Sequence, residues 1–395
     1  MSTPLSASAT GLPADRHGAT LVGRVWLPSV DGPALVAVHG DGLHDLSSVA
    51  PTCSQLLELD DPVAAVRRAG SLPRIGSVEA VLACAVGPGD QSPRPEPWLL
   101  APCDLQAIKA SGVTFVASLL ERVIEEQARG DAGKAESVRQ SIVAIIGGNL
   151  RDLRPGSPQS RAVKDALIAQ GVWSQYLEVG IGPDAEIFTK GQPLSAVGSG
   201  ADVGIHPGSQ WNNPEPEVVL AVNSRGRVVG ATLGNDVNLR DFEGRSALLL
   251  GKAKDNNASG AIGPFIRLFD ERFGLDDVRG CDVELKVSGQ DGFTFTARSS
   301  MSQISRDPLE LVDHAMGRHH QYPDGMMLFL GTMFAPTIDR FGPGQGFTHA
   351  VGDLVEVSTP ALGRLVNRVD HTDQIAPWTF GAAALMKNLA QRGLL

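Results

Sequence analysis

The stretch of sequence that decides the fold is NNPEPEVVLAV, residues 212–222. It places Glu215 and Glu217 two positions apart and continues directly into an apolar run. Residues i and i+2 of a β-strand point to the same side, so we expect both carboxylates to aim at one point. The turn residues NSRG, 223–226, end the apolar run and predict a β-hairpin whose second strand is 227–233.

The residues after this hairpin extend the acidic pattern. In a tight hairpin Glu217 lies roughly opposite Thr232, and Asp236 lies just past the end of the pair, close enough to join both glutamates. Three converging carboxylates repel one another unless a cation is present. All-oxygen ligation selects a hard cation such as Mg²⁺, Ca²⁺ or Mn²⁺. The spacing alone leaves open a second interpretation, a solvated strand start whose edge is broken by proline.

A lysine follows the third carboxylate. Lys254 comes 18 residues after Asp236 and directly precedes the polar turn DNNASG, residues 255–260. An ammonium group beside a metal site can stabilise an enolate or carry a proton, and we expect its burial there to lower its pKa. The alternative is a surface lysine in a polar turn.

The rest of the chain predicts an α+β protein with two domains. We expect a flexible tail over 1–18, a small β-rich N-terminal domain over 19–100 and a catalytic, metal-binding domain over 101–395. The segment GPGDQSPRPEP, residues 87–97, is typical of a linker. Apolar spacing predicts helices over 116–129 and 161–170, the second capped by Gly171. Strand patterns dominate from about residue 177 and indicate a curled, mixed β-sheet or β-roll.

The composition excludes several function classes. The 395 residues include 34 Lys and Arg against 44 Asp and Glu, a net charge of −10. Nucleic acids and anionic membranes attract basic surfaces, so we expect neither as a partner. The four cysteines lack metal-ligand spacing, the N-terminus lacks a signal-peptide pattern, and the longest apolar runs are too short to span a bilayer. We therefore expect a cytoplasmic protein.

The region from Glu215 to Pro264 resembles the fumarylacetoacetate hydrolase family. That family carries an E-x-E pair, an N-D-x-x-x-R-D strand end and a lysine before a Gly-Pro turn. The matching residues are Glu215 and Glu217, NDVNLRD at 235–241, and Lys254 with Gly263-Pro264. The resemblance covers about residues 100–395. It implies a fumarylacetoacetate hydrolase-like fold for this domain and a divalent cation, most often Mg²⁺, on Glu215, Glu217 and Asp236.

One motif departs from the family's hydrolases. They carry G-x-N-Y-x-x-H-x-x-E, in which the His and Glu activate water, whereas this chain has GVTFVASLLE at 112–121. Ser118 replaces the histidine and Glu121 is kept. A serine hydroxyl cannot act as a base at neutral pH as an imidazole can, so hydrolytic C–C cleavage is not expected from these residues.

The subgroup that fits these features best is the 2-keto-3-deoxy-pentonate dehydratases. The similar blocks include IGPDAEIFTKG at 181–191, GNDVNLRDFEGRSALLL at 234–250 and GTMFAP at 331–336. The resemblance implies conversion of 2-keto-3-deoxy-D-xylonate, which is also 2-keto-3-deoxy-D-arabinonate, to 2-oxoglutarate semialdehyde in oxidative pentose degradation. It implies a small 2-keto acid as substrate and a homodimer or homotetramer.

The same resemblance assigns candidate roles. Lys254 is the candidate base or proton carrier, and the acid for the leaving hydroxyl comes from one of three residues: Glu121, Ser118 and Glu186. The candidate substrate-binding residues are Thr332, Arg240, Phe115 and Glu243. Structural roles compete with these: Ser118 as a helix-surface serine, Glu121 as a helix salt-bridge partner, and Arg240 as a partner of Asp241 or Asp236.

Two other functions stay open at this stage. One is a family hydrolase that cleaves a C–C bond of a 2,4-diketo sugar acid with another base. The other is a non-catalytic binding or structural protein stabilised by its metal.

Overall fold

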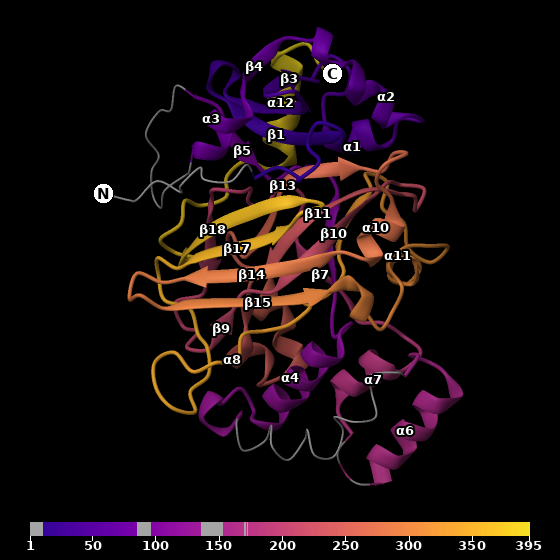
Figure 1. Ribbon diagram of the computed structural model, residues 1–395, viewed down its shortest axis with the longest axis vertical. Helices are drawn as coiled ribbons and strands as arrows, with labels where there is room; N and C mark the ends of the chain where they lie inside the picture. The colour runs from indigo at the N-terminus through magenta and orange to yellow at the C-terminus, as the bar shows by residue number, and fades with distance from the viewer. Residues whose placement is uncertain (1–10, 85–95, 136–152, 170, 172) are drawn as a thin grey trace.

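The computed structural model describes residues 11–84, 96–135, 153–169, 171 and 173–395. Most of the predicted linker and the first ten residues of the predicted tail lie outside this part. The described residues form two large β-sheets, a short strand pair and flanking helices, an α+β arrangement (Figure 1). The prediction that the sheet curls into a roll stays a prediction.

The larger sheet has eleven strands in the order β4-β3-β2-β1-β13-β11-β10-β16-β6-β7, with β5 paired to β1. Their bounds are β1 Leu21–Leu27, β2 Gly32–His39, β3 Gly42–Asp45, β4 Arg74–Ser77, β5 Trp98–Leu100, β6 Ala107–Ser111, β7 Ile187–Gly191, β10 Pro216–Val222, β11 Val228–Asp236, β13 Gly260–Leu268 and β16 Met326–Phe329. β16 pairs with β6 in parallel, and the other neighbours for which a register is defined are antiparallel.

The smaller sheet has five strands in the order β15-β14-β17-β18-β8 and lies across the front of the molecule in Figure 1. Its strands are β8 Asp202–Ile205, β14 Asp282–Ser288, β15 Thr294–Ser300, β17 Leu354–Thr359 and β18 Gly363–His371. The short pair joins β9 Asn212–Asn213 to β12 Asn238–Leu239. The residues of β17 alternate between half-buried and buried.

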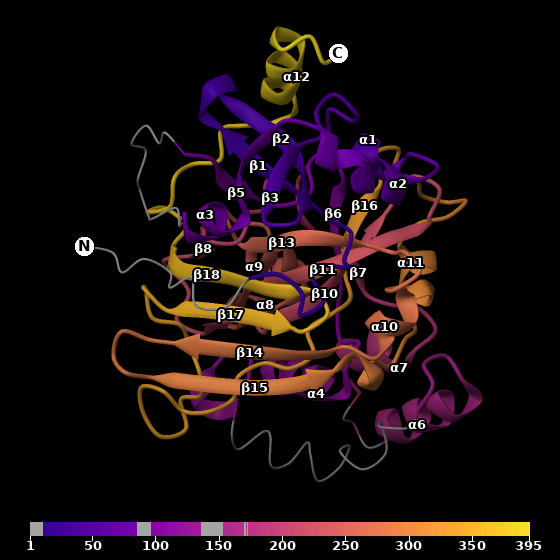
Figure 2. The ribbon, with the colours of Figure 1, turned by 45° about the horizontal axis from the view of Figure 1, so that its top comes forward.

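Helices lie at the top, at the bottom and along the right-hand side of the molecule in Figure 2. They are α1 Cys53–Leu57, α2 Pro62–Arg67, α3 Val78–Ala83, α4 Val116–Gln127, α6 Pro158–Ala169, α7 Gln175–Ile181, α8 Arg240–Glu243, α9 Leu250–Lys254, α10 Leu275–Arg279, α11 Pro308–Ala315 and α12 Ala382–Gln391. Gly171 has a φ of 69° just after α6, as predicted for a helix cap. Among the described helices, none has both the length and the apolar character needed to cross a membrane.

The N-terminal strands continue the larger sheet, because β1 pairs with β13. The C-terminal helix α12 is tied to the same region, where the side-chain amide of Asn388 donates to the carbonyls of Val30 and Asp31. Asp15, which lies in the predicted tail, forms an ion pair of 2.7 Å with Arg267 of β13. The proposed domain boundaries at residues 18 and 100 stay predictions.

The central hairpin forms as predicted, but its register is not the predicted one. Glu217 pairs with Gly234, and Thr232 pairs with Val219. The turn takes one residue more than expected, since Val222 pairs with Val228, and a bulge before Val222 adds a second. The two-residue shift places Asp236 level with Glu215, whose carbonyl accepts a hydrogen bond of 3.0 Å from the Asp236 amide.

β10 is buried on both faces, which explains its apolar run. Leu220 packs in one hydrophobic cluster with strands of the smaller sheet, whereas Val219 and Ala221 pack in another with the N-terminal strands and α1. A strand covered on both sides reads as continuously apolar rather than alternating. Glu217 therefore lies near the start of a strand that the core holds rigidly, and Glu215 directly precedes this strand.

Replacement Leu220→Ala is expected to lower the free energy of unfolding by about 3 kcal/mol, because it removes a fully buried side chain and leaves a cavity. Chemical denaturation measures the change. Leu248→Ala serves as the control, since Leu248 is 95 % exposed and its truncation should cost about 0.5 kcal/mol or less. Equal effects of the two changes would contradict the placement of β10 in the core.

Candidate active site

Three carboxylates converge at the start of the central hairpin. Glu215, Glu217 and Asp236 each offer one oxygen within 4.8 Å of the others, and all three side chains are buried. The backbone amide of Gly331 donates to Oε2 of Glu217 at 2.7 Å, and the side-chain oxygen of Asn235 accepts from the Glu215 amide. The predicted convergence of these residues is thus present in the structure.

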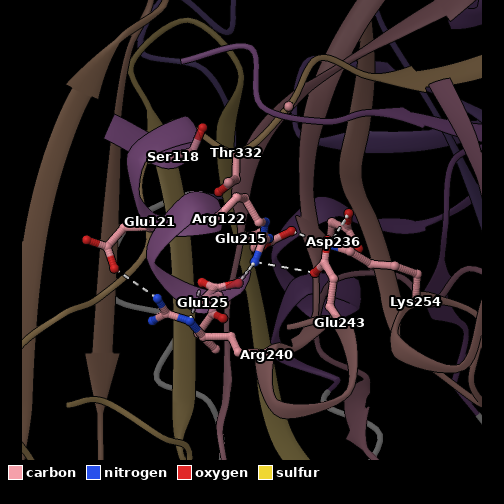
Figure 3. A network of polar contacts seen from close by, with 12 residues as sticks. Ser118, Glu121, Arg122, Glu125, Glu215, Asp236, Arg240, Glu243, Lys254 and Thr332 are labelled. Atoms are coloured by element: carbon pink, nitrogen blue, oxygen red, sulfur yellow. Dashed lines mark hydrogen bonds and ion pairs between the residues drawn. The ribbon is translucent and has the colours of Figure 1, made fainter. Parts of the chain in front are cut away.

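Three cationic side chains contact this trio, and two of them, Arg122 and Lys254, are labelled in Figure 3. Lys254 contacts Glu215 at 2.5 Å and Asp236 at 3.0 Å. Lys190, from β7, contacts the other oxygen of Asp236 at 2.7 Å. Arg122, from α4, donates to Glu215. Each of the three cations is almost completely buried, so these are ion pairs shielded from water.

The charges in this region do not balance. Five carboxyl groups, those of Glu186, Glu215, Glu217, Asp236 and Glu243, line the pocket, and Glu125 also pairs with Arg122, so carboxyl groups outnumber the three cations. Burial raises the pKa of Glu217 well above its usual range, and Asp236 and Glu215 add to that rise. A buried all-oxygen cluster in which carboxyl groups outnumber cations fits a hard cation.

The trio opens on a narrow pocket with a cavity volume of only about 10 Å³. Besides the trio, nine described residues line it: Ser111, Gly112, Val113, Arg122, Glu186, Phe188, Glu243, Lys254 and Thr332. No histidine occurs among these lining residues. The pocket therefore offers carboxyl, ammonium, guanidinium and hydroxyl groups, but no imidazole, within the described part of the chain.

Glu186 reaches the pocket because Gly112 leaves room for it. A Cβ atom at Gly112 would overlap with Oε2 of Glu186. Burial raises the pKa of Glu186 to about 7, and the charge of Glu243 contributes to the rise. A carboxyl group with this pKa is partly protonated at neutral pH, so Glu186 can donate a proton.

The four predicted catalytic residues do not all meet. Lys254 and Glu186 line the pocket. Glu121 and Arg122 leave α4 in different directions, and Glu121 accepts a hydrogen bond of 3.0 Å from Arg240 (Figure 3). Ser118 is buried, and its hydroxyl donates to the carbonyl of Phe115, the residue directly before α4. Glu121 and Ser118 are not among the residues that line the pocket.

The predicted substrate-binding residues also divide into two pairs. Thr332 and Glu243 line the pocket. Phe115 packs in the hydrophobic core at the start of α4. Arg240 is bound by three groups, the carboxylates of Glu125 and Glu121 and the carbonyl of Pro336, and its guanidinium lies 4.5 Å from the centre of the Trp211 ring. Neither Phe115 nor Arg240 reaches the pocket lining.

Two cations of the site escaped the sequence analysis. Arg122 lies on the side of α4 that also carries buried Leu119 and Val123. A charged residue on an apolar helix face is the one sequence feature that could have indicated its buried role. Lys190 is a charged residue near the end of a short strand, where exposure is the ordinary expectation. Its carbonyl and carboxylate partners come from distant parts of the chain.

The pKa of Lys254 is shifted upward by the protein's own groups, whereas the lowered pKa expected beside a bound cation stays a prediction. Burial does lower the pKa of this ammonium, but the charges of Asp236, Glu215 and Glu243 raise it by more, so the net shift is upward. The sequence could not show that the lysine itself pairs with the carboxylates. A cation bound to those carboxylates acts in the opposite direction because it neutralises them.

The chain is similar in sequence to two curated dehydratases. A stretch of 184 residues aligns at 29 % identity with 2-dehydro-3-deoxy-D-arabinonate dehydratase of Saccharolobus solfataricus. The alignment covers 47 % of this chain and 58 % of that protein. A probable 2-keto-3-deoxyxylonate dehydratase of Haloferax volcanii aligns at 28 % identity over 194 residues, covering 49 % of this chain and 63 % of the relative. The alignments thus span less than two thirds of these curated relatives.

The solved structures show the same fold. One is 2-keto-3-deoxy-D-arabinonate dehydratase complexed with magnesium and 2,5-dioxopentanoate, which superposes with a TM-score of 0.59 at 19 % identity over 89 % of this chain and 99 % of that chain. Residues 170–370, about half of the sequence, match the family model described as fumarylacetoacetate (FAA) hydrolase C-terminal. This match includes the carboxylate trio and Lys254, and we conclude that the chain belongs to the fumarylacetoacetate hydrolase family.

Proposed function

We propose that this chain is a metal-dependent hydro-lyase that converts 2-keto-3-deoxy-D-pentonate to 2-oxoglutarate semialdehyde in oxidative pentose degradation. One observation carries the proposal: the buried trio shares its pocket with Lys254 and with a carboxyl group that is partly protonated at neutral pH. The two curated relatives are named as dehydratases of this substrate class, which supports the same reaction.

Glu215, Glu217 and Asp236 are the residues that would hold the cation, with Mg²⁺ preferred and Mn²⁺ or Ca²⁺ as alternatives. A bound divalent cation supplies Lewis-acid stabilisation of the negative charge that develops on a 2-oxo acid when a proton leaves C3. The 2,5-dioxopentanoate in the related magnesium-containing structure is the same compound as the proposed product.

We assign removal of the C3 proton to Nζ of Lys254. Its nitrogen contacts two members of the trio and lines the pocket. Lys190 is less suited, because its ammonium is already enclosed by Asp236 and by the carbonyls of Val237 and Lys254. The Lys190 contact with the Lys254 carbonyl instead holds the backbone of the proposed base.

We assign the acid role to Glu186. With a pKa raised to about 7, its carboxyl can protonate the C4 hydroxyl as it leaves, so water departs with the proton from Glu186. The double bond formed between C3 and C4 then shifts to C4–C5, and the resulting enol tautomerises to the aldehyde. Thr332 and Glu243 are the proposed hydrogen-bonding partners of the substrate hydroxyls.

A hydrolase reaction receives less support. The described lining residues include no imidazole that could activate water, and Glu121 is held by Arg240 outside the pocket. The cytoplasmic location and the homodimer or homotetramer stay predictions.

Incubation with 2-keto-3-deoxy-D-xylonate and Mg²⁺ tests the proposal. We expect a semialdehyde, measured by trapping with an aldehyde reagent, and no product in a parallel sample with excess EDTA. Release of pyruvate would indicate C–C cleavage, and the absence of turnover on this acid and on a 2,4-diketo acid would favour a binding protein.

A further inference from the structure

We infer that Arg122, and not the predicted substrate-binding residue Arg240, is the group that receives the substrate's carboxylate. This inference rests on the proposed function, since it concerns how the same pocket holds an anionic 2-oxo acid. It also implies that Arg122 exchanges partners, leaving Glu215 when a cation occupies the carboxylate trio.

Two carboxylates, those of Glu125 and Glu243, hold one side of the Arg122 guanidinium. Its Nη1 donates to Glu125 on the same helix at 2.6 Å and lies 3.3 Å from Glu243. Its Nη2 donates to Glu215. One nitrogen thus fixes the guanidinium to α4 and α8, whereas the other faces the trio in the pocket.

The Nη2 contact is the one that a cation would disturb. Glu215 already shares its two oxygens between Arg122 and Lys254. Since a carboxylate that ligates a divalent cation has little remaining attraction for a neighbouring guanidinium, Nη2 is released while Nη1 keeps its partners. A planar guanidinium with one free edge suits a carboxylate oxygen.

Arg240 has no comparable free edge. Its Nε, Nη1 and Nη2 donate to Glu125, the Pro336 carbonyl and Glu121, and its face stacks on Trp211. Arg240 therefore ties α4 to α8 and does not line the pocket. Because Glu125 binds both arginines, Arg240 also orients Arg122 indirectly.

The test measures binding rather than turnover. For wild type and Arg122→Gln, calorimetry gives the affinity for Mn²⁺ alone, and then for pyruvate and its uncharged analogue pyruvamide with Mn²⁺ present. We expect Arg122→Gln to bind Mn²⁺ at least as tightly as the wild type, because a competitor for Glu215 is gone. Its affinity for pyruvate should fall about ten- to hundredfold, and that for pyruvamide by less than about threefold.

Three further variants complete the design. Arg122→Lys should recover part of the preference for pyruvate, because it keeps the charge but loses the planar fork. Arg240→Lys should change the ratio of the two affinities far less than Arg122→Gln does, because Arg240 acts on Arg122 only through Glu125. Arg24→Gln controls for the loss of a buried arginine elsewhere, since Arg24 donates to the Ala101 carbonyl and lies outside the pocket.

Several outcomes would overturn the inference. Equal weakening of pyruvate and pyruvamide in Arg122→Gln, unchanged pyruvate affinity, or loss of Mn²⁺ binding would each indicate a structural role only. A wild type that binds no Mn²⁺ overturns it together with the proposed function. A wild type that binds Mn²⁺ and pyruvate but does not dehydrate the sugar acid contradicts the proposed reaction alone.

Discussion

Replacement Glu217→Gln is expected to abolish cation binding and turnover together while leaving the fold intact. Glu217 contributes one of three carboxylate oxygens that lie within 4.8 Å of one another. An amide oxygen has the same shape but no negative charge, so it weakens a site for a hard cation without creating a cavity. The hydrogen bond from the Gly331 amide can be retained by the glutamine oxygen.

The stability of this variant distinguishes a metal ligand from a structural residue. Burial and the neighbouring carboxylates raise the pKa of Glu217, so its charged form opposes folding when no cation is bound. With a folded pKa above the unfolded value, that penalty is absent at low pH and grows as the pH rises above the unfolded pKa. At neutral pH and in EDTA, Glu217→Gln should therefore be at least as stable as the wild type.

Mn²⁺ titration, turnover and chemical denaturation in EDTA provide the three measurements. Asp202→Asn is the matched control, because Asp202 is a buried carboxylate that lies outside the pocket and pairs with Arg368. It should leave Mn²⁺ affinity unchanged. Full turnover of the wild type in excess EDTA would sink the metal assignment.

The sequence predicts the hairpin but not the register of its two strands. Period-two spacing predicts that Glu215 and Glu217 share a face, and turn residues locate the return strand. The turn takes one residue more than expected and the bulge beside Val222 adds a second, and together they moved the partner of Glu217 from Thr232 to Gly234. Asp236 still joined the trio, because the shift brought it level with Glu215 rather than past the end of the pair.

The ion-pair network shows a second limit of sequence reasoning. Arg122 and Lys190 find their partners across the fold, 93 positions away for Arg122 and Glu215. No local pattern reveals such a pairing. Arg240 lies in a recognisable motif, yet Glu121, Glu125 and Pro336 occupy its donors, so its position outside the pocket depends on contacts between α4 and α8. Local spacing predicts which carboxylates converge, whereas tertiary contacts decide which cationic side chains reach them.

Replacement Lys254→Met is expected to reduce turnover by about a thousandfold or more, because it removes the group that we assign to the C3 proton. Methionine keeps an unbranched chain of similar length in the buried position. Mn²⁺ affinity should not fall, since the ammonium that contacts Glu215 and Asp236 is gone. Lys252→Met is the matched control, because Lys252 is an exposed lysine on the same helix. This variant should convert the substrate at the wild-type rate.

Proton exchange separates the base from the acid. With Mn²⁺-free, Mg²⁺-loaded protein in D₂O, NMR follows the replacement of pyruvate methyl protons by deuterium, which requires proton removal at C3 but no leaving group. Lys254→Met should lose this exchange, whereas Glu186→Gln should keep it and lose only dehydration of the sugar acid. Because pyruvate has no C4 hydroxyl, the two variants differ in exchange only if the base and the acid are different residues. Normal exchange in Lys254→Met would exclude the lysine as the base, and parallel loss in both variants would show that Glu186 takes part in proton removal.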